Sequence, residues 1–253
     1  MDLSFGADVV AAFLLATART AGFVLVAPPF STRTVPQQVR AGVALTLAIP
    51  LSGLLVDSAP ALGSSALISG LLLQLVLGAV LGFVVLLAVA TVQTIGDLID
   101  ITGGFSAAVG MDPLGLNQSS VMGRIHNLLA VTLLFIGGGH LIVLQGLARG
   151  VETMPNPSFD REGLAHTMAD GVASMILSAV QITAPIMAAL LIADLALGLL
   201  TRAAPALNAF SLSFPLKIML TLLMIGLVLH QIPGLLDRLV NHAGITMVQI
   251  AGG

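Results

Sequence analysis

The sequence predicts an all-α integral membrane protein built from about six hydrophobic helical blocks, arranged as packed and partly bent helical hairpins. Of its 253 residues, 57% are hydrophobic and only 8% are charged. A soluble domain carries about 25% charged residues, so this chain cannot form an ordinary charged surface. Disorder is excluded too, because it requires low hydrophobicity. A bilayer-crossing helix needs about 20 apolar residues, so six of them would use roughly half of the chain.

The first two blocks, 9–27 and 41–56, are the weaker candidates for membrane helices. Arg19 interrupts the first block, and the second is short and ends at Pro50. An arginine near the middle of a span costs about 2.5–3.5 kcal/mol on insertion scales. We therefore expect Arg19 to face protein or water, or else to extend toward an interface. The acidic start, with Asp2 and Asp8, lacks the positive region of a signal peptide, so the spans themselves should direct membrane insertion.

The remaining four blocks, 64–93, 125–148, 171–200 and 216–232, are each marked by an interval without charged residues. These intervals run between Asp57 and Asp97, Arg124 and Arg149, Asp170 and Asp194, and Lys217 and Asp237. Each interval is long enough for a spanning helix. As a single helix, block 64–93 would extend about 40 Å, which exceeds the roughly 30 Å hydrocarbon layer. Asp170 and Asp194 flank the fifth block, and we expect them near its ends. Two glycine pairs at helical spacing, Gly78 with Gly82 and Gly146 with Gly150, would allow close helix contacts.

The stretch from Asp97 to His126 is too polar to face lipid and too apolar for an ordinary solvated loop. Four glycines permit unusual backbone conformations, and Pro113 prevents one helix from continuing through it. Irregular backbone at membrane depth is tolerated only against protein or a water-filled cavity. The stretch is therefore either a pore-lining re-entrant element or an interfacial loop.

No residue pattern in the chain indicates an enzyme, a metal site or a cofactor site. Cysteine is absent, and the five histidines are scattered without an HExxH motif. Neither a GxSxG motif nor a glycine-rich phosphate loop is present. His140 alone is a candidate for a proton-linked role, with a structural histidine as the alternative. Nine Lys and Arg residues with a net charge of -3 offer no surface for nucleic acid.

Two proline-containing junctions resemble each other and predict a worn repeat of one helical hairpin. Residues 27–40 join the first two blocks, and residues 204–217 join the last two. Each contains Pro, then Phe-Ser, then a basic residue, Arg40 or Lys217, that we expect to open the next helix. Paired hairpins are common among transporters, so this repeat does not by itself identify a function.

Several short motifs together resemble the family of the flagellar biosynthetic protein FliR and its injectisome counterpart, over residues 9–232. No single motif is specific to this family, but the order and spacing of the motifs among the hydrophobic blocks are. They are Arg33…Pro36…Arg40, Gly103-Gly104-Phe105, Asp112-Pro113, Val121-Met122-Gly123-Arg124, Asn127-Leu128-Leu129-Ala130, Gly139-His140-Leu141, the run from Ala193 to Pro205, and the run from Phe210 to Lys217.

The resemblance implies a subunit of a bacterial type III export gate. Family members assemble with FliP and FliQ into a closed cone, with FlhB around its base, and unfolded flagellar subunits pass through the centre. It implies one membrane-embedded domain, 1–253, with a FliP-like part at about 1–150 and a FliQ-like part at about 165–253. It further implies a place in the bacterial inner membrane, in contact with lipid and within the flagellar basal body.

The resemblance also implies a plug loop at about 105–119 that closes the conduit. Its residues would be Phe105, Gly110, Met111, Asp112, Pro113, Leu114, Gly115, Leu116 and Asn117. The hydrophobic blocks carry five polar positions that we expect to be structural. These are Arg19, Arg124, His140, Asp194 and Arg202.

The distribution of Lys and Arg predicts that both termini face the periplasm. With six spans and this orientation, the cytoplasmic segments contain five of these residues and the outer segments three, as the positive-inside rule favours. Two other functions remain open at this point. A secondary transporter should have ionisable residues clustered at the membrane midplane, and this chain has few inside its blocks. A purely structural membrane scaffold would differ from the gate only in not touching the exported chain.

Overall fold

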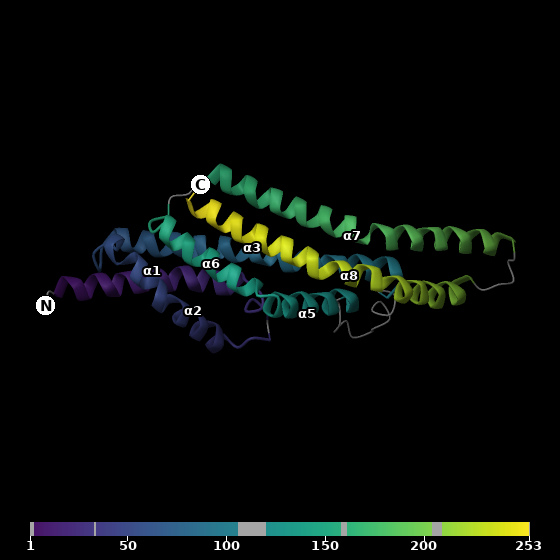
Figure 1. The fold of residues 1–253 in the computed structure, drawn as a ribbon, viewed down its shortest axis with the longest axis horizontal. Helices are drawn as coiled ribbons and strands as arrows, with labels where there is room; N and C mark the ends of the chain where they lie inside the picture. The colour runs from purple at the N-terminus through teal and green to yellow at the C-terminus, as the bar shows by residue number, and fades with distance from the viewer. Residues whose placement is uncertain (1–2, 33, 106–119, 158–160, 204–208, 253) are drawn as a thin grey trace. The chain divides into compact units, whose positions relative to one another are not determined.

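The computed structural model describes residues 3–32, 34–105, 120–157, 161–203 and 209–252, and these form helices and short turns without strands (Figure 1). The fold class predicted from composition is therefore confirmed. The elements are α1 (Leu3–Val26), α2 (Gln37–Ser52), the short 3-10 helix η1 (Gly53–Ser58), α3 (Ser65–Gly103), α5 (Val121–Ile136), α6 (Gly139–Thr153), α7 (Arg161–Ala203) and α8 (Ala209–Gly252).

All six hydrophobic blocks coincide with helices that are apolar enough to cross a membrane. Five helical stretches qualify alone, namely Gly6–Val26, Gln37–Ser58, Ser65–Gly103, Glu162–Ala203 and Ser213–Ile250. The fourth block qualifies only as the pair α5 and α6, because the helix breaks at Gly137 and Gly138. Gly138 has a φ of 75°, a left-handed conformation that favours glycine, so the break follows from the local sequence.

The helices extend further than the hydrophobic blocks. Helix α3 has 39 residues, about 58 Å at 1.5 Å per residue, and α7 and α8 have 43 and 44. Asp97–Gly103 belongs to α3, and Val121–His126 belongs to α5. The polar stretch we expected to be irregular is thus helical at both ends. Asp170 and Asp194 lie inside α7 rather than at its ends.

Two expectations about prolines were wrong. Helix α8 begins at Ala209, so Pro215 lies inside the helix instead of in a turn, and Lys217 does not open it. Helix α2 continues past Pro50 to Ser52. Prolines are tolerated inside long apolar helices, where neighbouring groups satisfy the freed carbonyls. The first junction, after α1, does form turns over residues 27–32.

The chain forms two compact units, each assembled from separate segments. The first comprises Met1–Ala88, Leu134–Gly171 and Arg238–Gly253, and the second comprises Val89–Leu133 and Val172–Asp237. The division into FliP-like and FliQ-like parts stays a prediction. Within the first unit the most deeply buried side chains include Leu15, Leu55, Leu77, Leu81, Leu147 and Met247. Within the second they include Ile95, Ile99, Ile186, Leu190 and Ile232.

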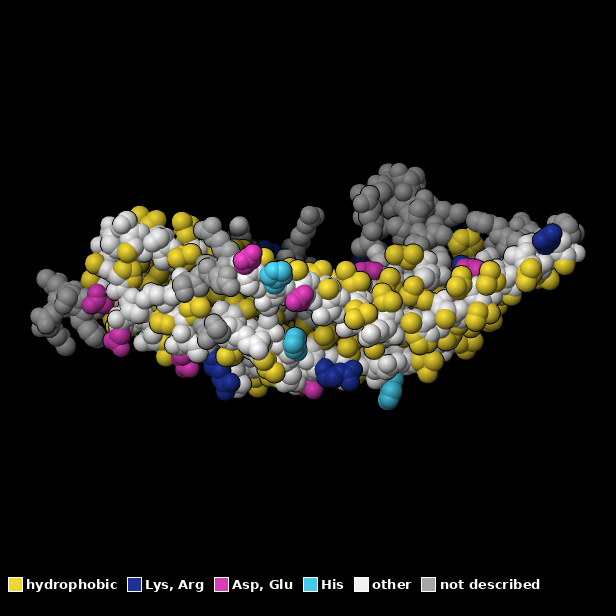
Figure 2. Space-filling view, turned by 90° about the horizontal axis from the view of Figure 1, so that it is seen from above, with side chains coloured by type: hydrophobic (Ala, Val, Ile, Leu, Met, Phe, Trp, Pro, Cys, Tyr) yellow, Lys and Arg dark blue, Asp and Glu magenta, His cyan; other side chains and the backbone are white. Residues whose placement is uncertain are grey.

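Much of the surface is apolar, as expected for a protein that contacts lipid or partner subunits. Figure 2 shows hydrophobic side chains over much of the visible face, with charged and histidine side chains as small separate groups. Burial is low on α2 with η1, on α7 and on α8, where 22% of the most apolar stretch is buried, compared with 56% in α3. Large exposed patches of this kind mark membrane or protein interfaces.

Candidate functional site

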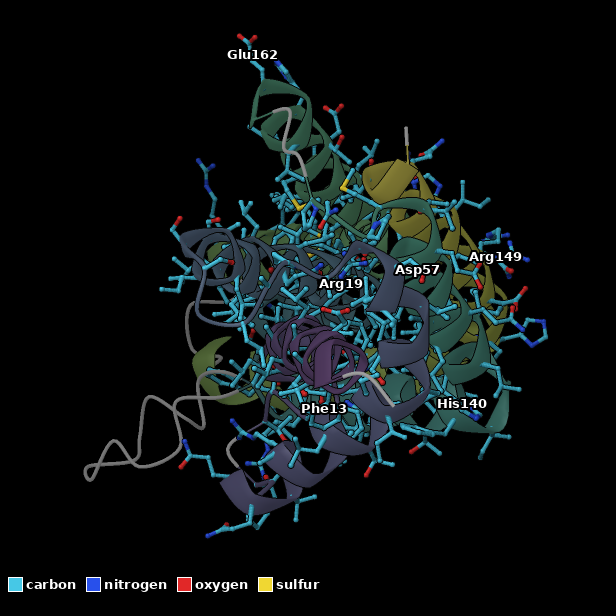
Figure 3. All side chains as sticks on the ribbon, turned by 90° about the vertical axis from the view of Figure 1, so that its left-hand side faces the viewer. Phe13, Arg19, Asp57, His140, Arg149 and Glu162 are labelled. Carbon is cyan, nitrogen blue, oxygen red and sulfur yellow. The ribbon has the colours of Figure 1, made fainter. Side chains whose placement is uncertain are left out.

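Arg19 of α1 is the centre of a buried polar cluster in the first unit. Its side chain is fully buried, and it lies among the helices in Figure 3. The guanidinium donates through Nε to Oε1 of Gln74 in α3, through Nη1 to the carbonyl of Gly150 at 2.7 Å, and through Nη2 to the carbonyl of Met154 at 2.6 Å. Gln74 in turn donates to the carbonyl of Pro155 at 2.7 Å. The cluster joins α1, α3 and the C-terminal end of α6.

The charge of Arg19 is balanced by the end of a helix, since no carboxylate pairs with it in the described part of the chain. The carbonyls of Gly150 and Met154 lie at the C-terminus of α6, the negative end of its macrodipole. A cation in such a position gains up to about 2 kcal/mol when partly buried. Arg19 therefore contacts protein in this structure, and its described partners lie in its own chain.

Three glycines explain why α1 can lie directly against α3. A Cβ atom at Gly78 would lie 1.9 Å from the carbonyl oxygen of Arg19, and one at Gly82 would lie 2.7 Å from that of Phe23. From the other helix, a Cβ atom at Gly22 would lie 2.1 Å from the carbonyl oxygen of Leu75. The spacing of Gly78 and Gly82 therefore reflects a close backbone contact, as the sequence suggested.

A second polar cluster lies in the second unit, where α3 meets the start of α5. The buried carboxylate of Asp100 accepts a hydrogen bond from the backbone N–H of Met122 at 3.2 Å. The hydroxyl of Ser120 accepts one from the N–H of Gly123 at 2.8 Å. A Cβ atom at Gly123 would lie 1.8 Å from Oδ1 of Asp97, so the two helices touch here. Two oxygens thus cap the first turn of α5, where acidic side chains are also favoured by the macrodipole.

His126 and Asn127 extend this contact one turn along α5. The ring of His126 is buried, its Nδ1 lies 2.8 Å from the carbonyl of Met122, and its Nε2 has no hydrogen-bond partner among the described residues. The amide of Asn127 donates to Gln93 of α3 at 2.9 Å. The C-terminal end of α3 and the N-terminal end of α5 are therefore fixed to each other, immediately before and after residues 106–119.

The structure separates the polar positions predicted from the sequence. Asp194 of α7 forms an ion pair with Lys217 of α8, with 2.7 Å between Oδ1 and Nζ. Arg124 and Arg202 are exposed and have no ion pair within the described residues. The ring of His140 stacks on Phe135 with 5.2 Å between centroids, and its buried Nδ1 has no hydrogen-bond partner in the described part of the chain. A proton-linked role for His140 stays a prediction.

Most of the predicted plug loop lies outside the described residues. Residues 106–119 are not described, so Gly110, Met111, Asp112, Pro113, Leu114, Gly115, Leu116 and Asn117 carry no structural statement. Phe105 is described and is partly buried in the turn after α3. The role of the loop stays a prediction.

Sequence reasoning missed the partners of these polar residues. Gln74 and Asp100 complete the two clusters, and His126 lies buried beside the second. One signal was present for Gln74, which is a polar residue inside the charge-free block 64–93. A buried amide in an apolar helix requires a partner, but the sequence alone does not identify that partner.

Comparison with known proteins gives a consistent result over nearly the whole chain. The family described as bacterial export proteins, family 1, matches residues 10–243. The flagellar biosynthetic protein FliR of Pectobacterium carotovorum subsp. carotovorum is 30% identical over 236 residues, which cover 92% of this chain and 90% of the relative. FliR of Bacillus subtilis (strain 168) is 31% identical over 86% of each chain. The Yop proteins translocation protein T of Yersinia pestis is 28% identical over 57% of this chain and 56% of the relative.

Proposed function

Because the chain belongs to family 1 of the bacterial export proteins, the family of the flagellar biosynthetic protein FliR, we propose that it helps to form and close the conduit for unfolded flagellar subunits. Proteins of this family are structural components of the type III or flagellar export apparatus and not enzymes. The chain accordingly works in a complex with other export components, in the bacterial inner membrane. Membership of an export family favours this function over a small-molecule or ion transporter.

One observation carries the proposal for closure, namely the way in which the ends of residues 106–119 are held. The segment leaves α3 and returns to α5 where Asp100 and Ser120 cap the first turn of α5. Both ends of the connection are therefore attached to one helix pair within the second unit. The segment between them contains Gly110 and Gly115, together with apolar side chains and a single charge. Such a segment can fill a conduit through weak apolar contacts, so moving it aside breaks no buried ion pair.

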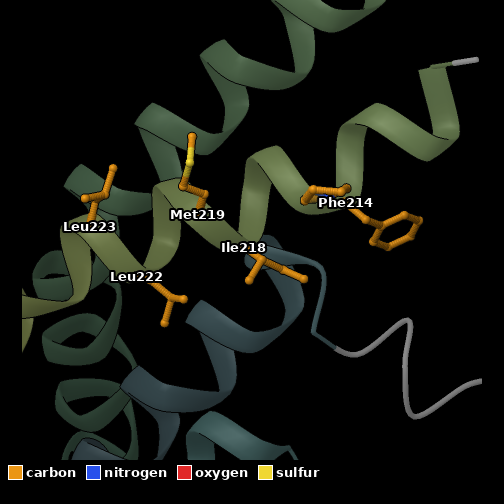
Figure 4. Close-up of a pocket in the computed structure, with 6 residues that line it drawn as sticks. Phe214, Ile218, Met219, Leu222 and Leu223 are labelled. Carbon is orange, nitrogen blue, oxygen red and sulfur yellow. The ribbon is translucent and has the colours of Figure 1, made fainter.

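Exposed apolar surface on α7 and α8 supports assembly with FliP and FliQ homologues and with an FlhB homologue. In α8 an apolar hollow of about 610 Å³ is lined by Phe214, Pro215, Ile218, Met219, Leu222 and Leu223 (Figure 4). In α7 Asp194 remains 44% exposed between strongly exposed leucines and isoleucines. Because a charge against lipid tails is costly, a protein neighbour or water suits this face better than lipid alone.

Co-purification with a tagged copy tests the assembly directly. After extraction in a mild detergent, we expect FliP and FliQ homologues to elute with the tagged chain. We also expect little of the chain to accumulate when it is produced without them, since its exposed apolar surface would lack partners. Recovery of a lone monomer or a self-dimer, in equal yield with and without those subunits, would contradict the proposal.

A further inference from the structure

A groove in the first unit has a lining that the export function does not explain. It lies between α6 and the C-terminal part of α8 and has a volume of about 380 Å³. The polar part of its lining consists of Arg149, Gln145, Asn241 and Gln249, which carry a guanidinium and three carboxamides. Among the residues that line the groove, Arg149 carries the only charge.

The groove exists because glycines let the two helices approach each other. A Cβ atom at Gly244 of α8 would lie 2.8 Å from Cγ2 of Ile142, and one at Gly146 of α6 would lie 3.1 Å from Sδ of Met247. Both glycines line the groove, so its floor is backbone and small groups. A larger residue in place of Gly146 or Gly244 would fill part of this space.

The charge of Arg149 has no partner within the described residues. Arg149 is exposed, lies at the edge of the protein in Figure 3, and forms no ion pair there. The nearby C-terminal end of α6 does not need this charge, because the carbonyls of Gly150 and Met154 already accept hydrogen bonds from Arg19. Arg149 and the adjacent carboxamides of Gln145 and Gln249, neither of which has a partner there, are therefore available to an external anion.

The groove is also lined by apolar side chains, namely Ile142, Ile245 and Val248, and Ile245 is 58% exposed. A ligand that satisfies both kinds of lining must carry an anionic, hydroxyl-bearing group on an apolar body. We propose that the groove binds an anionic glycerophospholipid, with its phosphate on Arg149, its headgroup hydroxyls on the carboxamides of Gln145 and Gln249, and an acyl chain against the apolar side chains. Basic pockets between membrane helices bind lipid headgroups in this way.

Phosphatidylglycerol is the simplest lipid with this chemistry, so it is the probe we would use. Its glycerol headgroup can exchange hydrogen bonds with carboxamides, whereas the choline of phosphatidylcholine can neither donate nor accept one. We expect the purified export complex in mild detergent to retain phosphatidylglycerol in preference to phosphatidylcholine when bound lipids are counted by native mass spectrometry. Arg149→Gln should weaken retention about five-fold, the worth of one basic side chain at an anionic lipid surface.

Two further variants separate lipid binding from a change in folding. Gln145→Glu keeps the shape of an exposed side chain but adds a negative charge to the groove, so it should also weaken retention of phosphatidylglycerol. Arg124→Gln removes the same charge as Arg149→Gln from an exposed arginine that does not line the groove, and retention should be unchanged. If Arg149→Gln lowers the yield of complex, Gln145→Glu carries the test alone.

Several results would overturn the proposal. Equal retention by the wild type and by both groove variants would exclude the site, and an equal loss in Arg124→Gln would indicate a general charge effect. Inorganic phosphate should fail to displace the lipid, because it has no apolar body for Ile142 and Val248 to contact. Displacement by phosphate would show a simple anion site instead of a lipid site. None of these outcomes depends on whether the chain closes the export conduit.

Discussion

Replacing Arg19 tests how the first unit is held together. Arg19→Ala removes three hydrogen bonds from a fully buried site and leaves the side chain of Gln74 and the carbonyls of Gly150 and Met154 without their donor. Breaking a buried charged interaction costs about 3–5 kcal/mol when the remaining partners stay buried. That is a large part of the 5–15 kcal/mol that stabilises a typical folded domain.

The assay is thermal unfolding of the purified complex, followed by far-ultraviolet circular dichroism, which suits a helical chain without tryptophan. For a chain of this size each kcal/mol corresponds to roughly 2–4 °C, so a loss of about 3–5 kcal/mol should lower the melting temperature by about 6–20 °C. Arg19→Lys keeps the charge but lacks the planar guanidinium that reaches three acceptors at once. We therefore expect a smaller fall in melting temperature than for Arg19→Ala. Arg124→Ala is the matched control at an exposed, unpaired arginine, and it should stay within about 0.5 kcal/mol of the wild type.

The reasoning fails if Arg19→Ala and Arg124→Ala melt at the same temperature. It also fails if Arg19→Met is as stable as the wild type. An apolar side chain of similar length should not help, because Gln74 and the carbonyls would still be left buried without a donor.

Three further predictions concern the contact between α1 and α3, the first turn of α5, and the orientation of the termini. Gly78→Ala places a Cβ atom 1.9 Å from a backbone oxygen of α1 and should destabilise the protein by about 2 kcal/mol or more in the same melting assay, whereas Gly226→Ala, in open space, should be neutral or slightly stabilising. Asp100→Ala removes an acceptor from the first turn of α5 and should cost about 1–2 kcal/mol. Amide exchange should rise at the start of α5, and unchanged protection there would contradict the capping role. Cysteines introduced at Ser4 and Gly252, in a chain without native cysteine, should react with an impermeant thiol reagent from outside spheroplasts, and protection at both sites would reverse the predicted orientation.

The hydrophobic blocks could be predicted because a charge-free interval has few alternatives in a membrane protein. The ends of the helices could not, because α3 continues through polar residues such as Asp100 when α5 lies against it and donates a hydrogen bond to that carboxylate. The break at Gly137 and Gly138 was visible as a glycine run inside an apolar block. Its effect depended on the backbone conformation of Gly138, which hydropathy does not report.

For the polar clusters, the sequence indicated some of the polar residues but not the partners that they contact. The position of Arg19 in an apolar block indicated that it should avoid lipid, but its partners lie 55, 131 and 135 positions away along the chain. Separations of this size follow from helix packing and leave no local pattern. Asp194 likewise required Lys217 of α8, which we expected at the start of a helix and which lies inside one.

The measurement that tests the central claim most directly is the ion conductance of a membrane containing the assembled complex with and without residues 110–117. The account predicts that deletion of Gly110–Asn117 leaves the complex assembled, since Asp100 and Ser120 still fix the flanking helices, while passive permeability to ions rises. A replacement of the same length with Gly and Ser should leak as well, because it lacks the apolar contacts of Met111, Leu114 and Leu116. A control substitution in an exposed turn, Leu62→Ser, should remain as tight as the wild type. An assembled deletion complex with the conductance of the wild type would contradict the proposed closing role.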